Sequence, residues 1–137
     1  MEIVTYTKRK LQNILKKNFT NKDCDFYLND QSYAVMDASW IKTECYRAYR
    51  KWLRLAGISK WKTNWDCDNF AQSFKMYVNL LHARENPETF TTKRSGAKNT
   101  TDARATAVGV MFYKNSDRSA HAVNIIATED NEVLFFE

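Results

Sequence analysis

The 137-residue sequence is poor in the residues on which several classes of protein depend. It contains three glycines and one proline, and so few glycines leave no glycine-rich loop to hold a phosphate. We therefore expect no nucleotide, flavin or nicotinamide cofactor. No hydrophobic run approaches the roughly 18 residues of a membrane-spanning helix, so the sequence predicts no membrane partner.

Cysteine is also scarce. Cys24, Cys45 and Cys67 are odd in number and lack the paired short spacing of zinc sites. We expect free thiols in a reducing compartment, and no metal. The N-terminus turns basic within ten residues and has no apolar core of a signal peptide, which predicts a cytoplasmic location.

The overall composition is that of a globular protein. Hydrophobic residues make up 44% of the chain and aromatic residues 14%, and the length predicts a single domain. Charge is uneven, because residues 1–65 contain 13 Lys and Arg against 6 Asp and Glu, whereas residues 66–137 contain 8 against 10. Two interpretations of the basic half stay open: an ordinary solvated surface, or a surface that binds nucleic acid.

Hydrophobic periodicity predicts helices first and strands afterwards. The helices are expected over residues 7–17, 40–56 and 66–83, and the strands over 106–113, 120–128 and 132–137. Residues 18–39 are expected to be irregular apart from one short strand, and the polar segment 84–105 to be a mobile loop. This order predicts an α+β fold, with N-terminal helices packed on a C-terminal antiparallel β-sheet.

Two of these helices have clear boundaries and apolar faces. Gly57 is placed to end the second helix, and Asp66 to cap the third. The apolar stripe expected for the second helix is Ile41, Cys45, Ala48, Tyr49, Trp52 and Leu55. The stripe expected for the third is Cys67, Phe70, Ala71, Phe74, Tyr77, Val78 and Leu81.

Cys67 is the first candidate for chemistry. It lies in the first turn of the third predicted helix, where unpaired N–H groups and the helix dipole favour a thiolate. The same N–H groups are suited to an oxyanion. Asp66 and Asp68 act in the opposite sense, because adjacent negative charge disfavours a thiolate. The alternative is an ordinary core cysteine.

His121 is the second candidate. The other histidine, His82, is near the end of the third predicted helix, where a cation suits the dipole. His121 begins a predicted strand and shares a face with Val123 and Ile125. From that position it could pair with Cys67. The alternative is a histidine with only a local hydrogen bond.

Glu137 is a candidate to orient the imidazole. If 129–131 is a three-residue hairpin loop with Asn131 in the left-handed region, Thr128 pairs with Glu132 and Val123 with Glu137. Glu137 is then one diagonal step from His121 on the same face. A two-residue loop would place Glu137 on the opposite face.

Three stretches together resemble a known family. Residues 65–71, Trp-Asp-Cys-Asp-Asn-Phe-Ala, resemble the nucleophile segment of transglutaminase-like cysteine peptidases, of the papain-like superfamily and of a small phage or bacterial type. His121-Ala122-Val123 is similar to its histidine strand, and Glu137 follows on the next strand. The similarity covers residues 61–137, the implied core, and residues 1–60 are the N-terminal helical part.

The resemblance implies a hydrolase or transferase with a thiol nucleophile. Cys67 would attack a peptide or carboxamide carbonyl, His121 would carry the proton, and Glu137 would hold the imidazole. The resemblance implies that the oxyanion or the substrate is bound by residues around the thiol. The candidates are Trp65, Trp61, Gln31, Asp66 and Asn69.

Two other functions stay open. One is a non-catalytic binding or inhibitor module of phage origin, which has the same scaffold and binds a host protein. The other is a nucleic-acid-binding protein that uses Lys8, Arg9, Arg50 and Lys51. For the enzyme, the expected partner is a protein or peptide substrate.

Overall fold

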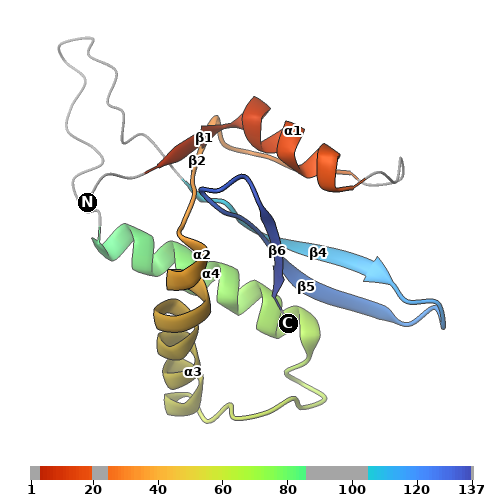
Figure 1. Cartoon of the computed structure of the whole chain (residues 1–137). Helices are drawn as coiled ribbons and strands as arrows, with labels where there is room; N and C mark the ends of the chain where they lie inside the picture. The colour runs from red at the N-terminus through yellow and green to blue at the C-terminus, as the bar shows by residue number, and fades with distance from the viewer. Residues whose placement is uncertain (1–3, 20–24, 86–104, 137) are drawn as a thin grey trace.

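The computed structural model describes residues 4–19, 25–85 and 105–136 (Figure 1). The elements, in chain order, are β1 (Thr5–Thr7), α1 (Lys8–Asn18), β2 (Ser32–Ala34), α2 (Ala38–Trp40), the π-helical turn η1 (Ile41–Cys45), α3 (Tyr46–Leu55), α4 (Cys67–Glu85), β3 (Ala105–Thr106), β4 (Val108–Lys114), β5 (Ala120–Ala127) and β6 (Val133–Phe136). The expected helices and C-terminal strands are therefore present within a few residues of their predicted ends. The predicted mobile loop falls almost wholly outside the described residues. Within the described ranges, no helix is both long and apolar enough to cross a membrane.

The strands form two three-stranded sheets. In the first, β1 pairs antiparallel with β2, and β2 pairs parallel with β3, in the order β1-β2-β3. In the second, β4, β5 and β6 are antiparallel neighbours in that order. The prediction of N-terminal helices packed on one antiparallel sheet is therefore wrong. β2 is the one short strand expected within residues 18–39, whereas the three-residue strand β1 is too short to produce a recognisable alternation in the sequence.

The β5–β6 hairpin has the register of a three-residue loop. The Thr128 N–H donates to the Glu132 carbonyl over 2.9 Å, and Asn131 has a φ of 61°. Asn124 pairs with Phe136, which is the register that would place Val123 opposite position 137. The hairpin expectation is thus confirmed as far as Phe136, while Glu137 itself lies outside the described residues.

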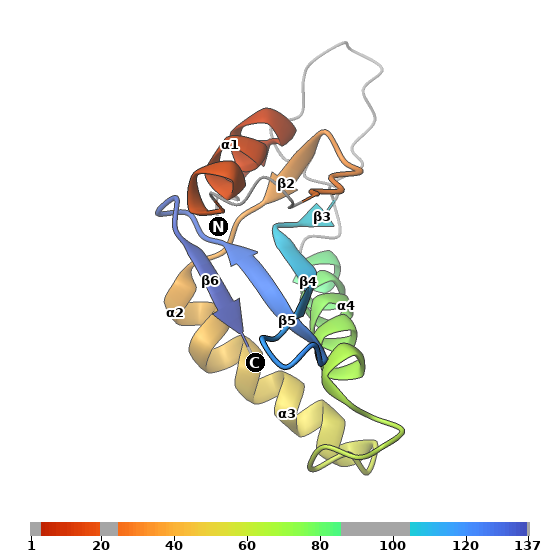
Figure 2. The same cartoon turned by 90° about the vertical axis from the view of Figure 1, so that its right-hand side faces the viewer.

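The second sheet is covered on both faces (Figures 1 and 2). Ile126 of β5 packs with Phe74 and Leu53 of the helices α4 and α3. Its neighbour Ile125 packs against the opposite cluster, which includes Leu11 of α1. Because successive strand residues point to opposite faces, this alternation places α1 and the first sheet on one side of β4–β6, and α3 and α4 on the other.

The second predicted helix is interrupted by the π-turn η1, where the Tyr46 N–H donates to the Ile41 carbonyl. Leu53 is 1% exposed, whereas Leu55 is 81% exposed. The fully buried stripe is Ile41, Cys45, Tyr49 and Leu53. The predicted stripe through Ala48, Trp52 and Leu55 is therefore wrong at its C-terminal end, because a π-turn holds one more residue than an α-turn and rotates the residues after it.

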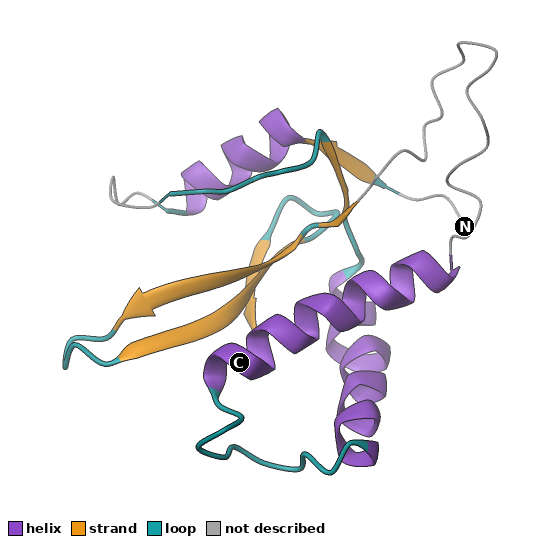
Figure 3. Ribbon diagram, turned by 180° about the vertical axis from the view of Figure 1, so that it is seen from behind, coloured by secondary structure: helices purple, strands orange, loops and turns teal. Residues whose placement is uncertain are grey.

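Helix α4 confirms most of its predicted stripe. Its buried residues are Ala71, Phe74, Val78, Leu81 and His82. His82, near the C-terminal end of the helix, is buried with 9% exposure. The connection formed by residues 56–66 runs from the end of α3 to the start of α4 (Figure 3). Gly57, with φ 81°, lies at the beginning of this connection as the predicted helix stop.

Candidate functional site

A half-open cleft of about 400 Å³ lies at the N-terminal end of α4. Its walls come from α3, the 56–66 connection, the first two turns of α4, and strands β5 and β6. The lining residues are Tyr46, Tyr49, Arg50, Lys60, Trp61, Cys67, Phe70, Ala71, Phe74, His121, Ala122, Asn124 and Phe136. Concave sites with mostly apolar walls and a few polar groups are where proteins usually bind small ligands.

The two main candidates from the sequence line this cleft together. Cys67 is the first residue of α4 and is half-buried. His121 is the second residue of β5, and its ring meets the Tyr113 ring edge-on with centroids 5.4 Å apart. Two segments that are far apart in the chain thus meet at one cavity. Trp61, 62% exposed, forms part of the rim.

Three more candidates lie beside the cleft without lining it. Trp65 exchanges backbone hydrogen bonds with Lys62, and its ring contacts Phe70 edge-on at 6.2 Å. Asn69 accepts the Asp66 N–H through its side-chain oxygen over 3.2 Å, which closes the first turn of α4. In the described structure these residues form the turn that leads into α4 and the first turn of that helix.

Gln31 is not brought to the cleft. It precedes β2, and its carbonyl accepts the Lys8 N–H over 2.9 Å, so it belongs to the α1 side of the molecule. Gln31 was a candidate only because, in the family that residues 65–71 resemble, a glutamine often donates a hydrogen bond to the oxyanion. Glu137 lies outside the described residues.

Asp66 and Asp68 bracket the thiol. A hydrogen bond with Asp68, together with burial, raises the pKa of the Asp66 carboxyl. One ligand atom from each of Asp66, Cys67 and Asp68 lies within 4.8 Å of the others, so these three are the described residues with the spacing to approach one cation. Such clusters are common at helix starts, and we assign no metal here.

Asn124 is a site residue that was not predicted from the sequence. It is 2% exposed, and its side-chain amide donates to the Ala71 carbonyl over 2.7 Å and to the Gly109 carbonyl over 3.1 Å. It therefore ties α4 to the second sheet at the base of the cleft. The sequence contains a sign of this role, because the polar side chain of Asn124 interrupts an apolar run between Val123 and Ile125. A buried amide in such a run needs hydrogen-bond partners.

The aromatic wall contributed by α3 and β6 was also missed. Phe136 stacks on Phe74 with centroids 4.9 Å apart and meets Tyr46 edge-on at 5.1 Å. The Tyr49 hydroxyl lies 2.7 Å from the Ser73 hydroxyl. In the sequence these residues look like ordinary core positions, and only the fold shows that they border a cavity.

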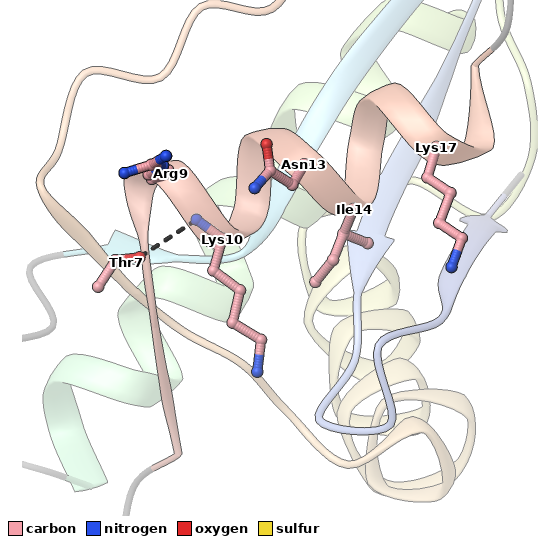
Figure 4. Close-up of a pocket in the computed structure, with 6 residues that line it drawn as sticks. All are labelled: Thr7, Arg9, Lys10, Asn13, Ile14 and Lys17. Atoms are coloured by element: carbon pink, nitrogen blue, oxygen red, sulfur yellow. Dashed lines mark hydrogen bonds between the residues drawn. The ribbon is translucent and has the colours of Figure 1, made fainter.

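A second hollow runs along the exposed side of α1 (Figure 4). Arg9, Lys10 and Lys17 line it, and the Thr7 hydroxyl caps the helix by accepting the Lys10 N–H over 3.1 Å. Arg50, another cation of the nucleic-acid hypothesis, lies on α3, across the second sheet (Figures 1 and 2). The four cations of that hypothesis therefore do not form one continuous surface, which removes its main support.

Comparison with known proteins gives structural neighbours only. No family model and no curated protein matches the sequence. The structure is similar to that titled "PSL1a-E64 complex", with a TM-score of 0.68 and 26% identity over 97% of this chain and 44% of that chain. It is also similar to a structure of Polyporus squamosus lectin bound to the human-type influenza-binding epitope Neu5Aca2-6Galb1-4GlcNAc, with a TM-score of 0.66 and 26% identity over 97% of this chain and 42% of that chain.

Both neighbours are structures of a lectin. They overturn the assignment to transglutaminase-like cysteine peptidases of phage or bacterial type, and with it the expectation of a papain-like core. The expected hydrolase or acyl-transfer activity, and the protein or peptide substrate, are corrected for the same reason. The short matches at residues 65–71 and 121–123 describe a local arrangement, a thiol at a helix start near a strand histidine, which is too brief to define a family.

The chain spans less than half the length of either neighbour. The similarity therefore covers nearly all of this chain and only one part of those proteins.

Proposed function

We propose that this chain is a binding module for a small ligand, and that the ligand occupies the cleft at the start of α4. The observation that carries the proposal is the convergence of separate segments of the chain on one cavity with aromatic walls. Cys67, His121 and Arg50 supply polar groups to its lining. Apolar walls with a few fixed polar groups favour a small molecule that is partly apolar.

The neighbours support this proposal through the compounds in their titles. One names E64, and the other names the sialylated trisaccharide Neu5Aca2-6Galb1-4GlcNAc. Aromatic faces and hydrogen-bonding side chains suit either compound. Because this chain spans under half of each neighbour, both compounds are probes for its cleft rather than known ligands.

The test is calorimetric titration of the chain with each compound. We expect at least one of them to bind with one-to-one stoichiometry. Trp61→Ala should weaken that binding by about tenfold, corresponding to the loss of about 1.4 kcal/mol of contact at the rim. Since Trp61 is 62% exposed, its removal should leave the fold intact.

Tyr27→Ala is the matched control. Tyr27 is 84% exposed and does not line the cleft, so its loss should leave the affinity unchanged. Equal weakening by the two substitutions would place the ligand elsewhere. Failure of both compounds to bind at millimolar concentration would contradict the proposal.

A further inference from the structure

The cleft has cationic side chains and no carboxylate among its described lining residues. Arg50 of α3 and Lys60 of the 56–66 connection both line it. In the part of the chain that the structure describes, the one ion pair within 4.0 Å joins Arg84 and Glu85, at the other end of α4. Arg50 and Lys60 thus face the cavity without a described carboxylate at ion-pair distance.

The charge of Arg50 acts on the cleft wall. Burial raises the pKa of the Tyr49 phenol, and the neighbouring Arg50 guanidinium opposes that increase by favouring the phenolate. Tyr49 and Arg50 both line the cavity, so the field of the guanidinium extends into it.

The acidic residues near the thiol offset this field only in part. Asp66 and Asp68 are adjacent to Cys67 in the chain but are not part of the lining. Arg50 and Lys60 line the cavity itself, whereas the Asp66 and Asp68 carboxylates lie outside the lining, around the Cys67 sulfur. The α3 side of the cavity therefore remains the cationic side.

We infer that the cleft selects small ligands that carry a carboxylate or a similar anion, which Arg50 and Lys60 bind while the aromatic wall contacts the rest. A guanidinium can donate two parallel hydrogen bonds to a carboxylate, and a lysine adds a point charge. This inference rests on the proposed function, since it names the chemical class of the ligand for the same site.

Two alkylating reagents of nearly equal size test the inference. Iodoacetate is an anion and iodoacetamide is neutral, and both label the Cys67 thiolate. The labelling rates of Cys67 are measured by peptide mass spectrometry at pH 8, and the iodoacetate rate is divided by the iodoacetamide rate. Because both reagents react with the same thiolate, this ratio does not depend on the fraction of Cys67 that is ionised. It reports the local electrostatic potential at the thiol. We expect the double variant Arg50→Gln, Lys60→Gln to lower this ratio by roughly threefold or more in low salt.

Lys51→Gln is the control, because Lys51 is the next residue of α3 and is exposed, but does not line the cleft. It should lower the ratio by much less than the double variant does, because its charge is more distant from the cavity and exposed to solvent. Cys45 is buried, so its resistance to both reagents verifies that each variant is folded. An equal ratio at Cys67 in the wild type and the double variant would overturn the inference.

The two proposals fail separately. Binding of E64 or of the trisaccharide with an unchanged labelling ratio would contradict the anion preference alone. A ratio that falls as expected, with no binding of either compound, would contradict the proposed function and leave the charge of the cleft established.

Discussion

Two cysteines show how strongly the surroundings of a residue decide its chemistry. Cys45 is 1% exposed, in the core between α3 and the second sheet, while Cys67 is half-buried at the cleft. Burial, with a smaller contribution from the negative charge of Glu85, raises the pKa of the Cys45 thiol to about 12. Cys45 is therefore protonated in the folded protein at every pH near neutrality.

This raised pKa predicts how stability depends on pH. An unfolded cysteine has a pKa of about 8.5, so below that pH both states are protonated and Cys45 contributes no pH dependence. Above it, the unfolded state loses the proton that the folded state keeps. The free energy of unfolding should therefore fall by about 1.4 kcal/mol per pH unit because of Cys45.

Urea denaturation at pH 7.5 and 9.5, under reducing conditions, measures this slope. Cys45→Ala should remove about 1.4 kcal/mol of the fall in stability between these two pH values, because only the unit above pH 8.5 contributes. The substitution also lowers stability at both values by opening a small cavity. Cys67→Ala, which leaves the buried thiol in place, should keep the Cys45 contribution. An unchanged slope in Cys45→Ala would show that the thiol is not held protonated by the fold.

At the level of single residues, the sequence was most informative where a residue type has special chemistry. Cys67, His121 and Trp61 were singled out for that reason, and all three line the cleft. Tyr46 was not singled out, and Arg50 was considered only for nucleic-acid binding, because at helical spacing they are indistinguishable from an ordinary amphipathic surface. Contact with a cavity is a property of tertiary structure, and no local pattern encodes it.

Among the elements, the π-turn has the largest effect on the site. A regular helix over 40–56 would bury Leu55 and expose Leu53, but the turn at Ile41–Cys45 changes the face that α3 presents. With Leu53 inward, Tyr46, Tyr49 and Arg50 lie along the side of α3 that borders the cleft. The position of one extra residue in a single turn thus decides which side chains of α3 line the cleft.

The π-turn predicts which leucine of α3 contributes to stability. Leu53→Ala should lower the free energy of unfolding by about 2–5 kcal/mol, because it leaves a cavity in the core. Leu55→Ala, the same change two residues later, should alter it by less than about 0.5 kcal/mol, because Leu55 is 81% exposed. Urea denaturation of both variants provides the comparison. A larger loss in Leu55→Ala than in Leu53→Ala would mean that α3 follows the regular helical register, and similar losses would contradict the burial difference between the two leucines.

Strand prediction succeeded or failed according to length. β4 and β5 have seven and eight residues and were recognised from their alternation, and the register of the β5–β6 hairpin followed from its loop. β2 is the one short strand that was expected within residues 18–39, but its partner was not predicted. β1 has three residues, and it pairs with β2 between positions as distant in the chain as Thr5 and Ala34. Pairings of that kind depend on tertiary packing and leave little trace in a short window.

Across the whole molecule, the second sheet is the common support for two different surfaces. One of its faces packs on α3 and α4, which form the cleft, and the other packs on α1, whose outer side is basic. Asn124 fastens α4 to this sheet through two hydrogen bonds from a buried amide. The walls of the cleft are therefore held by the same packing that stabilises the fold.

The family assignment failed at this scale because it rested on a few residues around the thiol. Residues 65–71 and 121–123 are a small part of the 137 positions, and they describe a helix start and a strand. The architecture around them, with two three-stranded sheets, resembles that of a lectin over 97% of the chain. Local chemistry and overall architecture are separate properties, and the second could not be inferred from the first.

A small ligand is proposed to bind in the cleft between α3, the start of α4 and β5. A crystal structure of the chain with E64 or the trisaccharide, whichever binds more tightly, tests it most directly. We predict electron density for the compound in contact with Cys67 and Trp61, with its anionic group toward Arg50 and Lys60. Density for the compound at another surface, with the cleft unoccupied, would contradict the claim.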